Sequence, residues 1–98
     1  MAIKHTSQTD QLARSLLTLA SPEECYRFLE DICTIKEIYA ISQRLEVARV
    51  LAEGESYQHT QEKTGASSAT ISRVKRCLDY GEGGYRLVLE RMKGEDQA

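Results

Sequence analysis

The fold is decided by one stretch of the chain: Thr64-Gly65-Ala66-Ser67-Ser68-Ala69-Thr70-Ile71-Ser72-Arg73-Val74-Lys75-Arg76-Cys77-Leu78. Its apolar residues Ile71, Val74 and Leu78 recur at helical spacing, which predicts a helix over about 68–78 with one buried face. Gly65 accepts the positive φ that a tight turn needs. We therefore expect a turn over residues 65–67, directly before this helix.

A second short helix is expected just before the turn. Ser56 is a good N-cap, and the polar run that follows it predicts a helix over residues 57–64. Two short helices joined by a three-residue turn that contains glycine form a helix-turn-helix. The sequence therefore predicts this motif over about residues 56–78.

The rest of the chain is also predicted to be helical. Ser21, Pro22 and Glu24 signal a helix start, Thr34 with Glu37 signals another, and further helices are expected over about residues 10–19 and 85–93. The third helix should run from Thr34 to about residue 53 and end at a glycine. No segment shows a convincing strand pattern, so we predict an all-α fold of about six helices in a single domain over residues 1–98.

Composition narrows the class of protein. The chain has 98 residues, of which 41% are hydrophobic and 29% charged, as in ordinary globular proteins. No apolar run approaches the roughly 20 residues that span a bilayer, and the first ten residues have no apolar stretch like that of a signal peptide. We therefore expect no membrane partner and a location in the cytoplasm.

The sequence gives little support for a metal site, a cofactor or an enzyme activity. Cys25, Cys33 and Cys77 form no C-x-x-C pair, so we expect buried, reduced thiols and neither a disulfide nor a metal site. The sequence shows no paired carboxylates of a catalytic cleft, no nucleophile with a base and no phosphate-binding glycine loop. We expect no catalytic residues and no cofactor.

Charge and side-chain size together favour DNA as the partner. Residues 56–78 carry four cations and one carboxylate, net +3, whereas the whole chain is −2, which leaves −5 elsewhere. The second helix begins with small side chains, so its N-terminal end could approach base edges in the major groove. A polar and basic strip follows. The residues expected at the DNA from this pattern are Ser67, Ser68, Ala69, Thr70, Ser72, Arg73, Lys75 and Arg76.

One alternative stays open at this point. Helix-turn-helix units also serve as docking modules for other proteins, without sequence-specific DNA binding. The salt dependence of binding distinguishes the two interpretations. DNA binding weakens steeply with salt because counterions are released, whereas binding through an apolar protein interface does not.

Residues 34–78 resemble the tryptophan repressor family, in particular its tryptophan-repressor-like branch in Gram-positive bacteria. The stretches that carry the resemblance are Gln43-Arg44-Leu45-Glu46-Val47-Ala48-Arg49, Gly54-Glu55-Ser56-Tyr57 and the quoted run 64–78, with Glu24-Cys25-Tyr26-Arg27-Phe28-Leu29 extending it. The resemblance implies an intertwined homodimer of six-helix subunits. This dimer would bind double-stranded DNA as a transcription regulator of the repressor kind. The helix over about 68–78 would be its recognition helix.

The resemblance also implies roles for single residues. Ser68, Ala69 and Ser72 match base-facing positions, and Gln58 and Gln61 match DNA-facing positions of the preceding helix. In the tryptophan repressor itself, tryptophan lies between two arginines. The possible effector-binding residues that match are Arg44, Arg73, Thr34 and Thr70.

Two departures bear on the effector and on the first helix of the motif. Val74 stands where the family has a glycine beside the ligand, so its side chain would intrude on an indole ring. We therefore expect that tryptophan is not a tight effector here. Thr60 stands where an apolar residue packs the first helix of the motif, and burying its hydroxyl without a partner would cost about 1–3 kcal/mol. We expect that this helix is loosely held.

Overall fold

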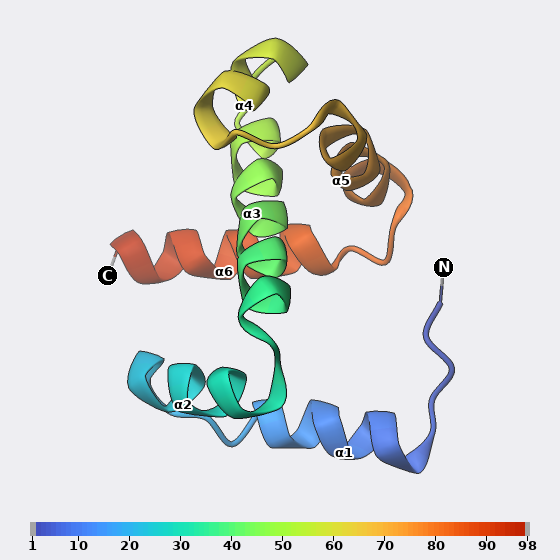
Figure 1. Cartoon of the computed structure of the whole chain (residues 1–98), viewed down its shortest axis with the longest axis vertical. Coiled ribbons are helices and arrows are strands. Elements are labelled where there is room, and N and C mark those ends of the chain that lie inside the picture. Colours follow the sequence, from blue (N-terminus) through green and yellow to red (C-terminus); the bar gives the residue numbers. More distant parts are fainter. Residues whose placement is uncertain (1, 98) are drawn as a thin grey trace. The chain divides into compact units, whose positions relative to one another are not determined.

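A computed structural model of the chain describes residues 2–97, with side chains through residue 95. These residues form six α-helices and no strand, which confirms the all-α prediction (Figure 1). The helices are α1 (Ser7–Leu16), α2 (Pro22–Ile32), α3 (Ile35–Ala52), α4 (Tyr57–Thr64), α5 (Ser68–Tyr80) and α6 (Gly84–Gln97).

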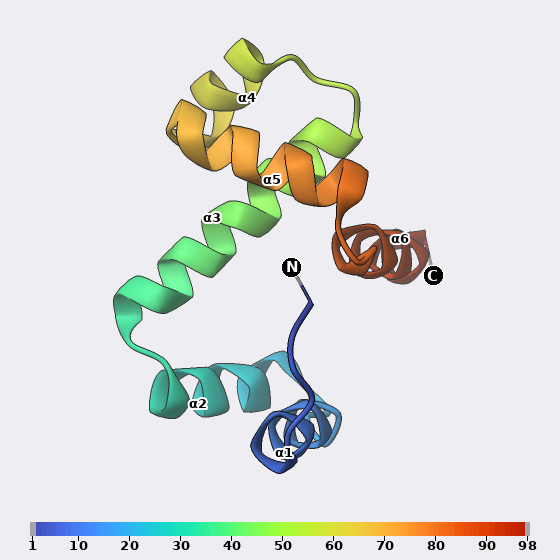
Figure 2. The ribbon, with the colours of Figure 1, turned by 90° about the vertical axis from the view of Figure 1, so that its right-hand side faces the viewer.

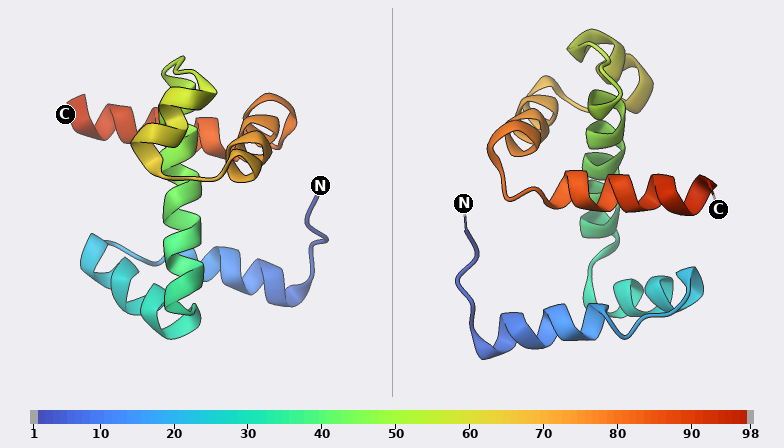
Figure 3. Two further views of the ribbon diagram at one scale, coloured as in Figure 1. Left: turned by 45° about the horizontal axis from the view of Figure 1, so that its top comes forward. Right: turned by 180° about the vertical axis from the view of Figure 1, so that it is seen from behind.

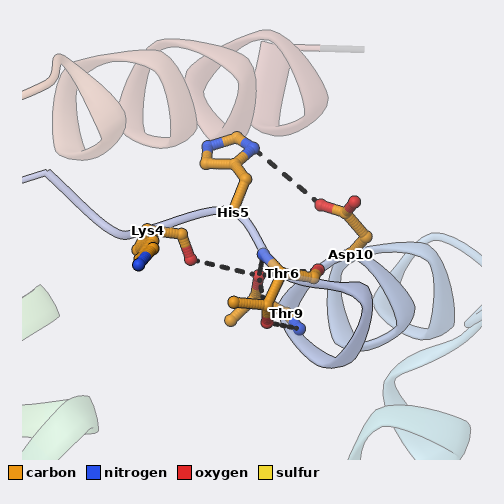
Figure 4. Close-up of polar contacts among 5 residues, drawn as sticks. All are labelled: Lys4, His5, Thr6, Thr9 and Asp10. Carbon is orange, nitrogen blue, oxygen red and sulfur yellow. Dashed lines mark hydrogen bonds and ion pairs between the residues drawn. The ribbon is translucent and has the colours of Figure 1, made fainter.

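The first helix begins three residues earlier than predicted, because a capping box precedes the apolar pattern. The Thr6 hydroxyl accepts a hydrogen bond from the Thr9 amide at 3.1 Å, and the Thr9 hydroxyl accepts one from the Thr6 amide at 2.8 Å (Figure 4). His5 lies beside this cap, with its Nδ1 3.8 Å from a carboxylate oxygen of Asp10. Threonine replaces the usual Glu or Gln at the third position of the box, and so the sequence pattern missed it.

The starts of the next two helices follow their predicted caps. Ser21 Oγ accepts from the Glu24 amide at 3.2 Å, although the Glu24 carboxylate turns to the amide of Ala20, at 2.9 Å, and so departs from a reciprocal box. Thr34 and Glu37 form the full box, with distances of 2.8 and 3.1 Å. The Thr34 amide and hydroxyl bonds lower the pKa of the Glu37 carboxyl.

The last two helices are longer than predicted. α5 continues to Tyr80, where the Gly81 amide donates to the Cys77 carbonyl at 2.9 Å. A Cβ on Gly81 would overlap that carbonyl oxygen, which explains why glycine ends the helix. α6 runs through Gly94, a residue that the expected end at 93 had excluded. A single exposed glycine weakens a helix by about 0.5–1 kcal/mol but does not stop it.

The chain divides into two compact units, residues 1–38 and 39–98. The predicted single domain stays a prediction. In the second unit, α4 packs beside α5 and α5 beside α6 (Figure 2). Further views show α4 and α5 at the C-terminal end of α3, with α6 passing across α3 (Figure 3). The core between these helices contains Val47, Ala48, Leu51, Ala66, Ile71, Val74, Leu78 and Leu89.

Residues 2–38 of the first unit contain no buried residue and so no comparable core. Neither α1 nor α2 contains a buried residue. Cys25 and Cys33 are half-buried, and in the second unit Cys77 is exposed, so the expectation of buried thiols is wrong. Four large apolar residues of α1 and α2 are exposed: Leu12, Leu16, Tyr26 and Ile32. Within residues 2–97, no helix is long and apolar enough to cross a membrane.

Candidate nucleic-acid interface

Backbone geometry and one threonine build the turn between α4 and α5. Gly65 ends α4 with φ at 73°, a conformation that side chains disfavour. Its amide donates to the Gln61 carbonyl at 2.9 Å. The Thr64 hydroxyl donates to the Thr60 carbonyl at 2.7 Å and accepts from the Ala66 amide at 3.2 Å. These bonds fix the direction in which the chain enters α5.

Two of the predicted DNA-facing residues form the start of α5. Ser67 is its N-cap, and Ser67 Oγ accepts from the Thr70 amide at 3.2 Å and lies 3.1 Å from the Thr70 hydroxyl. Thr70 is half-buried. Both hydroxyls therefore already hold the helix start, and the Ser67 oxygen lies at the positive end of the helix dipole.

The outer side of α5 opens with small exposed residues. Ser68, Ala69 and Ser72 are all exposed, and none has a large side chain. A surface of this kind lets the backbone of a helix approach another molecule closely. On the opposite side, Ile71 and Val74 are 1% exposed and Leu78 is 6% exposed, which confirms the predicted inner face.

The helix before the turn is held more firmly than the sequence suggested. Thr60 is completely buried, but its hydroxyl donates to the Ser56 carbonyl at 2.7 Å. The expected cost of an unpaired hydroxyl therefore does not arise. Ser56 also caps α4, because its side chain accepts from the His59 amide at 3.1 Å. We refer to α4, the turn and α5 together as the head.

The predicted cations differ in their surroundings. Arg73 and Arg76 are exposed and have no ion pair with any residue that the structure describes. Lys75 is half-buried, and its Nζ lies 3.4 Å from Asp79 Oδ1. Sequence reasoning missed Asp79, because the predicted helix ended one residue before it. The basic strip of α5 is thus partly neutralised at Lys75.

The two glutamines of α4 are also exposed. Gln58 Nε2 donates to Glu62 Oε1 over a long distance of 3.4 Å, along the same helix. Gln61 has no side-chain hydrogen bond to the described part of the chain. Both amides can turn toward a bound molecule without breaking a strong contact.

The possible effector-binding residues fall into different parts of the chain. Thr34 lies in the first unit, whereas Arg44, Thr70 and Arg73 lie in the second. The charges of Arg44 on α3 and Arg73 on α5 both act on the phenol of Tyr85 on α6. Burial raises the pKa of Tyr85, and the charges of Arg44 and Arg73 act against that rise. Sequence reasoning gave Tyr85 no role beside these two arginines.

Val74 is part of the core and not a lining of open space. It packs in the same cluster as Val47 and Ala48 of α3, and Tyr85 packs against that cluster. Within the described residues, no group of three or more histidine, cysteine, aspartate or glutamate side chains could hold a metal ion.

An anchored second helix, a glycine turn and a small, exposed leading face define a helix-turn-helix protein. The sequence profile of the Trp repressor protein family matches residues 7–93. The chain belongs to this family, which is one of DNA-binding transcription regulators.

Proteins similar to this chain come from several bacteria. The uncharacterized protein YerC of Bacillus subtilis (strain 168) is 57% identical over 86 residues, which cover 88% of this chain and 83% of that protein. The crystal structure of a TrpR like protein from Eubacterium eligens has a TM-score of 0.86 at 51% identity, covering 90% of this chain and 91% of the other. A crystal structure from Staphylococcus aureus has a TM-score of 0.87 at 45% identity, covering 91% and 89%.

Proposed function

We propose that this protein is a sequence-specific DNA-binding transcription regulator that acts as a homodimer, with α5 as its recognition helix. One observation carries the proposal: Ser68, Ala69 and Ser72 are exposed on one side of α5 while Ile71, Val74 and Leu78 are buried on the other. The first side can enter a groove, and the second fixes the helix to the body. Such a regulator acts where bacterial DNA is, in the cytoplasm.

The proposed contacts divide into two kinds. Ser68, Ala69 and Ser72 lead α5 into the major groove, where small side chains allow close approach to base edges. Arg73 and Arg76 contact phosphates, which supplies affinity without sequence information. The exposed amides of Gln58 and Gln61 on α4 add polar contacts beside the groove.

The homodimer is supported by apolar surface that this chain leaves exposed. No residue of α1 or α2 is buried, and the first half of α3 exposes Ile35, Tyr39 and Ile41 to 67%, 71% and 52%. Many exposed large apolar residues in one chain are typical of a protein that has an interface. A second copy of the chain would cover it with the same residues, as closed twofold symmetry requires.

We further propose that DNA binding does not depend on tryptophan. Val74 belongs to the packed core, and Tyr85 already contacts that core near Arg44 and Arg73. Side chains of the protein itself therefore hold the head. Titration calorimetry of the wild-type protein with L-tryptophan is expected to show no heat in the micromolar range.

Selection of binding sites from random duplex DNA, with and without L-tryptophan, tests the function. We expect enrichment of one twofold-symmetric sequence, the same in both arms, and a steep loss of affinity with salt. Bulky replacements at Ser68 or Ala69 should change the selected sequence, whereas Arg76→Ala should weaken binding to all sequences. Failure to enrich any sequence, together with salt-insensitive binding to a protein, would favour the docking-module alternative.

Sedimentation at micromolar concentration tests the homodimer. The expected mass is about twice the 11.1 kDa of one chain. A stable monomer would contradict the proposed assembly, because the exposed apolar residues would then be uncovered in solution.

A further inference from the structure

Three side chains meet at the C-terminal end of α5. Asp79 Oδ1 lies 3.4 Å from Lys75 Nζ and 3.7 Å from Arg86 Nη2. Arg86 comes from α6, and its Nε donates to the Leu78 carbonyl at 3.1 Å. One carboxylate oxygen is therefore shared by a cation of the recognition helix and a cation of the next helix.

The position of Asp79 is unusual for an acidic residue. The last turn of a helix carries the negative end of the helix dipole and carbonyls without an intrahelical partner, so a carboxylate is disfavoured there. Arg86 offsets both effects, because its guanidinium binds the Leu78 carbonyl and lies beside the Asp79 carboxylate. It thereby positions Asp79 beside Lys75, one turn back along α5.

We propose that Asp79 is an intramolecular competitor for DNA phosphate at Lys75 and so sets the strength of sequence-independent DNA binding. This inference rests on the proposed function. A phosphate that binds the Lys75 ammonium must displace a carboxylate that lies 3.4 Å away. When Lys75 turns to the phosphate, Asp79 still has Arg86 beside it, so the exchange leaves no carboxylate without a cation.

The neighbouring cations of α5 differ from Lys75 in having no carboxylate partner within the described residues. Arg73 and Arg76 are exposed without an ion pair to any described residue, so phosphate meets no competitor there. The Asp79 side chain is 34% exposed and that of Lys75 is 40% exposed, which places the pair in a partly screened setting. Exposed pairs of this kind contribute small free energies, and the expected effect on DNA affinity is about two- to five-fold.

The test measures binding of the full-length protein to a fluorescent duplex of random sequence over a series of salt concentrations. The variants are Asp79→Asn, Lys75→Ala and the double variant, with Glu82→Gln as the matched control. Glu82 lies in the loop after α5 and has no ion pair within the described residues, so its replacement removes one negative charge without releasing Lys75.

We expect Asp79→Asn to bind about two- to five-fold more tightly at low salt, with a steeper salt slope because another phosphate contact releases counterions. Glu82→Gln should gain clearly less, and the gain from Asp79→Asn should vanish in the Lys75→Ala background. Equal gains for Asp79→Asn and Glu82→Gln, or a gain that persists without Lys75, would overturn the inference and leave the proposed function standing. Absence of DNA binding by all variants and the wild type would overturn both.

Discussion

Replacement of Gly65 by alanine isolates the backbone contribution of the turn in the head. Gly65 has φ at 73°, and an added Cβ would meet nothing within 4 Å. The substitution therefore introduces no collision, and its effect comes from the backbone conformation alone. Gly94 in α6 is the matched control, because an added Cβ there also meets nothing within 4 Å and the residue is helical.

The two substitutions should change stability in opposite directions. Alanine in the left-handed region destabilises the folded state by about 1–2 kcal/mol. The reduced conformational freedom of the unfolded chain offsets about 0.4–1 kcal/mol of this loss. Gly65→Ala should therefore lower the free energy of unfolding by about 1 kcal/mol. Gly94→Ala should raise it by up to about 1 kcal/mol, because alanine favours the helix. Gly65→Asn should fall between wild type and Gly65→Ala, since asparagine tolerates the left-handed region.

Urea unfolding followed by circular dichroism at a fixed protein concentration measures these differences, because the stability of a dimer depends on concentration. A DNA titration of the same variants then shows whether the strained turn also displaces α5. The reasoning would be refuted if Gly65→Ala were neutral or stabilising, or if Gly65→Ala and Gly94→Ala shifted stability in the same direction.

Three further substitutions test separate contacts. Val74→Gly should lower the free energy of unfolding by about 3–4 kcal/mol, from lost burial and helix propensity, and a loss under 1 kcal/mol in urea unfolding would show that Val74 is not packed. Thr60→Val should cost about 1 kcal/mol, because it keeps the volume but removes the bond to the Ser56 carbonyl, and a neutral result would show that this bond adds no net stability to α4. The folded state lowers the Glu37 pKa, so this group stabilises the protein above its ordinary value of 4.5 and the effect is lost as pH falls through the lowered value. Glu37→Gln should flatten the stability profile in this acid range, and an unchanged profile would show that Glu37 does not contribute.

Local chemistry allowed the sequence to predict most of the fold. Thr34 with Glu37, Ser56 and Gly65 each act on neighbours within four residues, and the helices that they delimit agree with prediction to within a residue. The boundary errors have local causes as well. Thr9 completes the cap of α1 in place of a Glu or Gln, and α6 continues through Gly94, which was read as lying beyond the helix end.

The candidate site was predictable only where it depends on residues of a single helix. The buried and exposed sides of α5 follow from spacing along that helix, and both were predicted. The ion pair between Asp79 and Arg86 joins α5 to α6, and Tyr85 of α6 packs against the core that α3 and α5 share. A single sequence carries no signal for such pairs, because spacing along one helix does not say which face another helix presents.

Val74 bears both on the packing of the core and on whether an effector can bind. Its side chain was predicted to face inward, and its burial in the core confirms that prediction. The obstruction of an indole ring by Val74 stays a prediction. Volume that Val74 fills with packed contacts to the body is volume that a bound ring could not occupy. These contacts also connect α5 to α3 through Val47 and Ala48. We propose that a head held in this way needs no ligand to fix its position, so its affinity for DNA should respond to core substitutions more than to L-tryptophan.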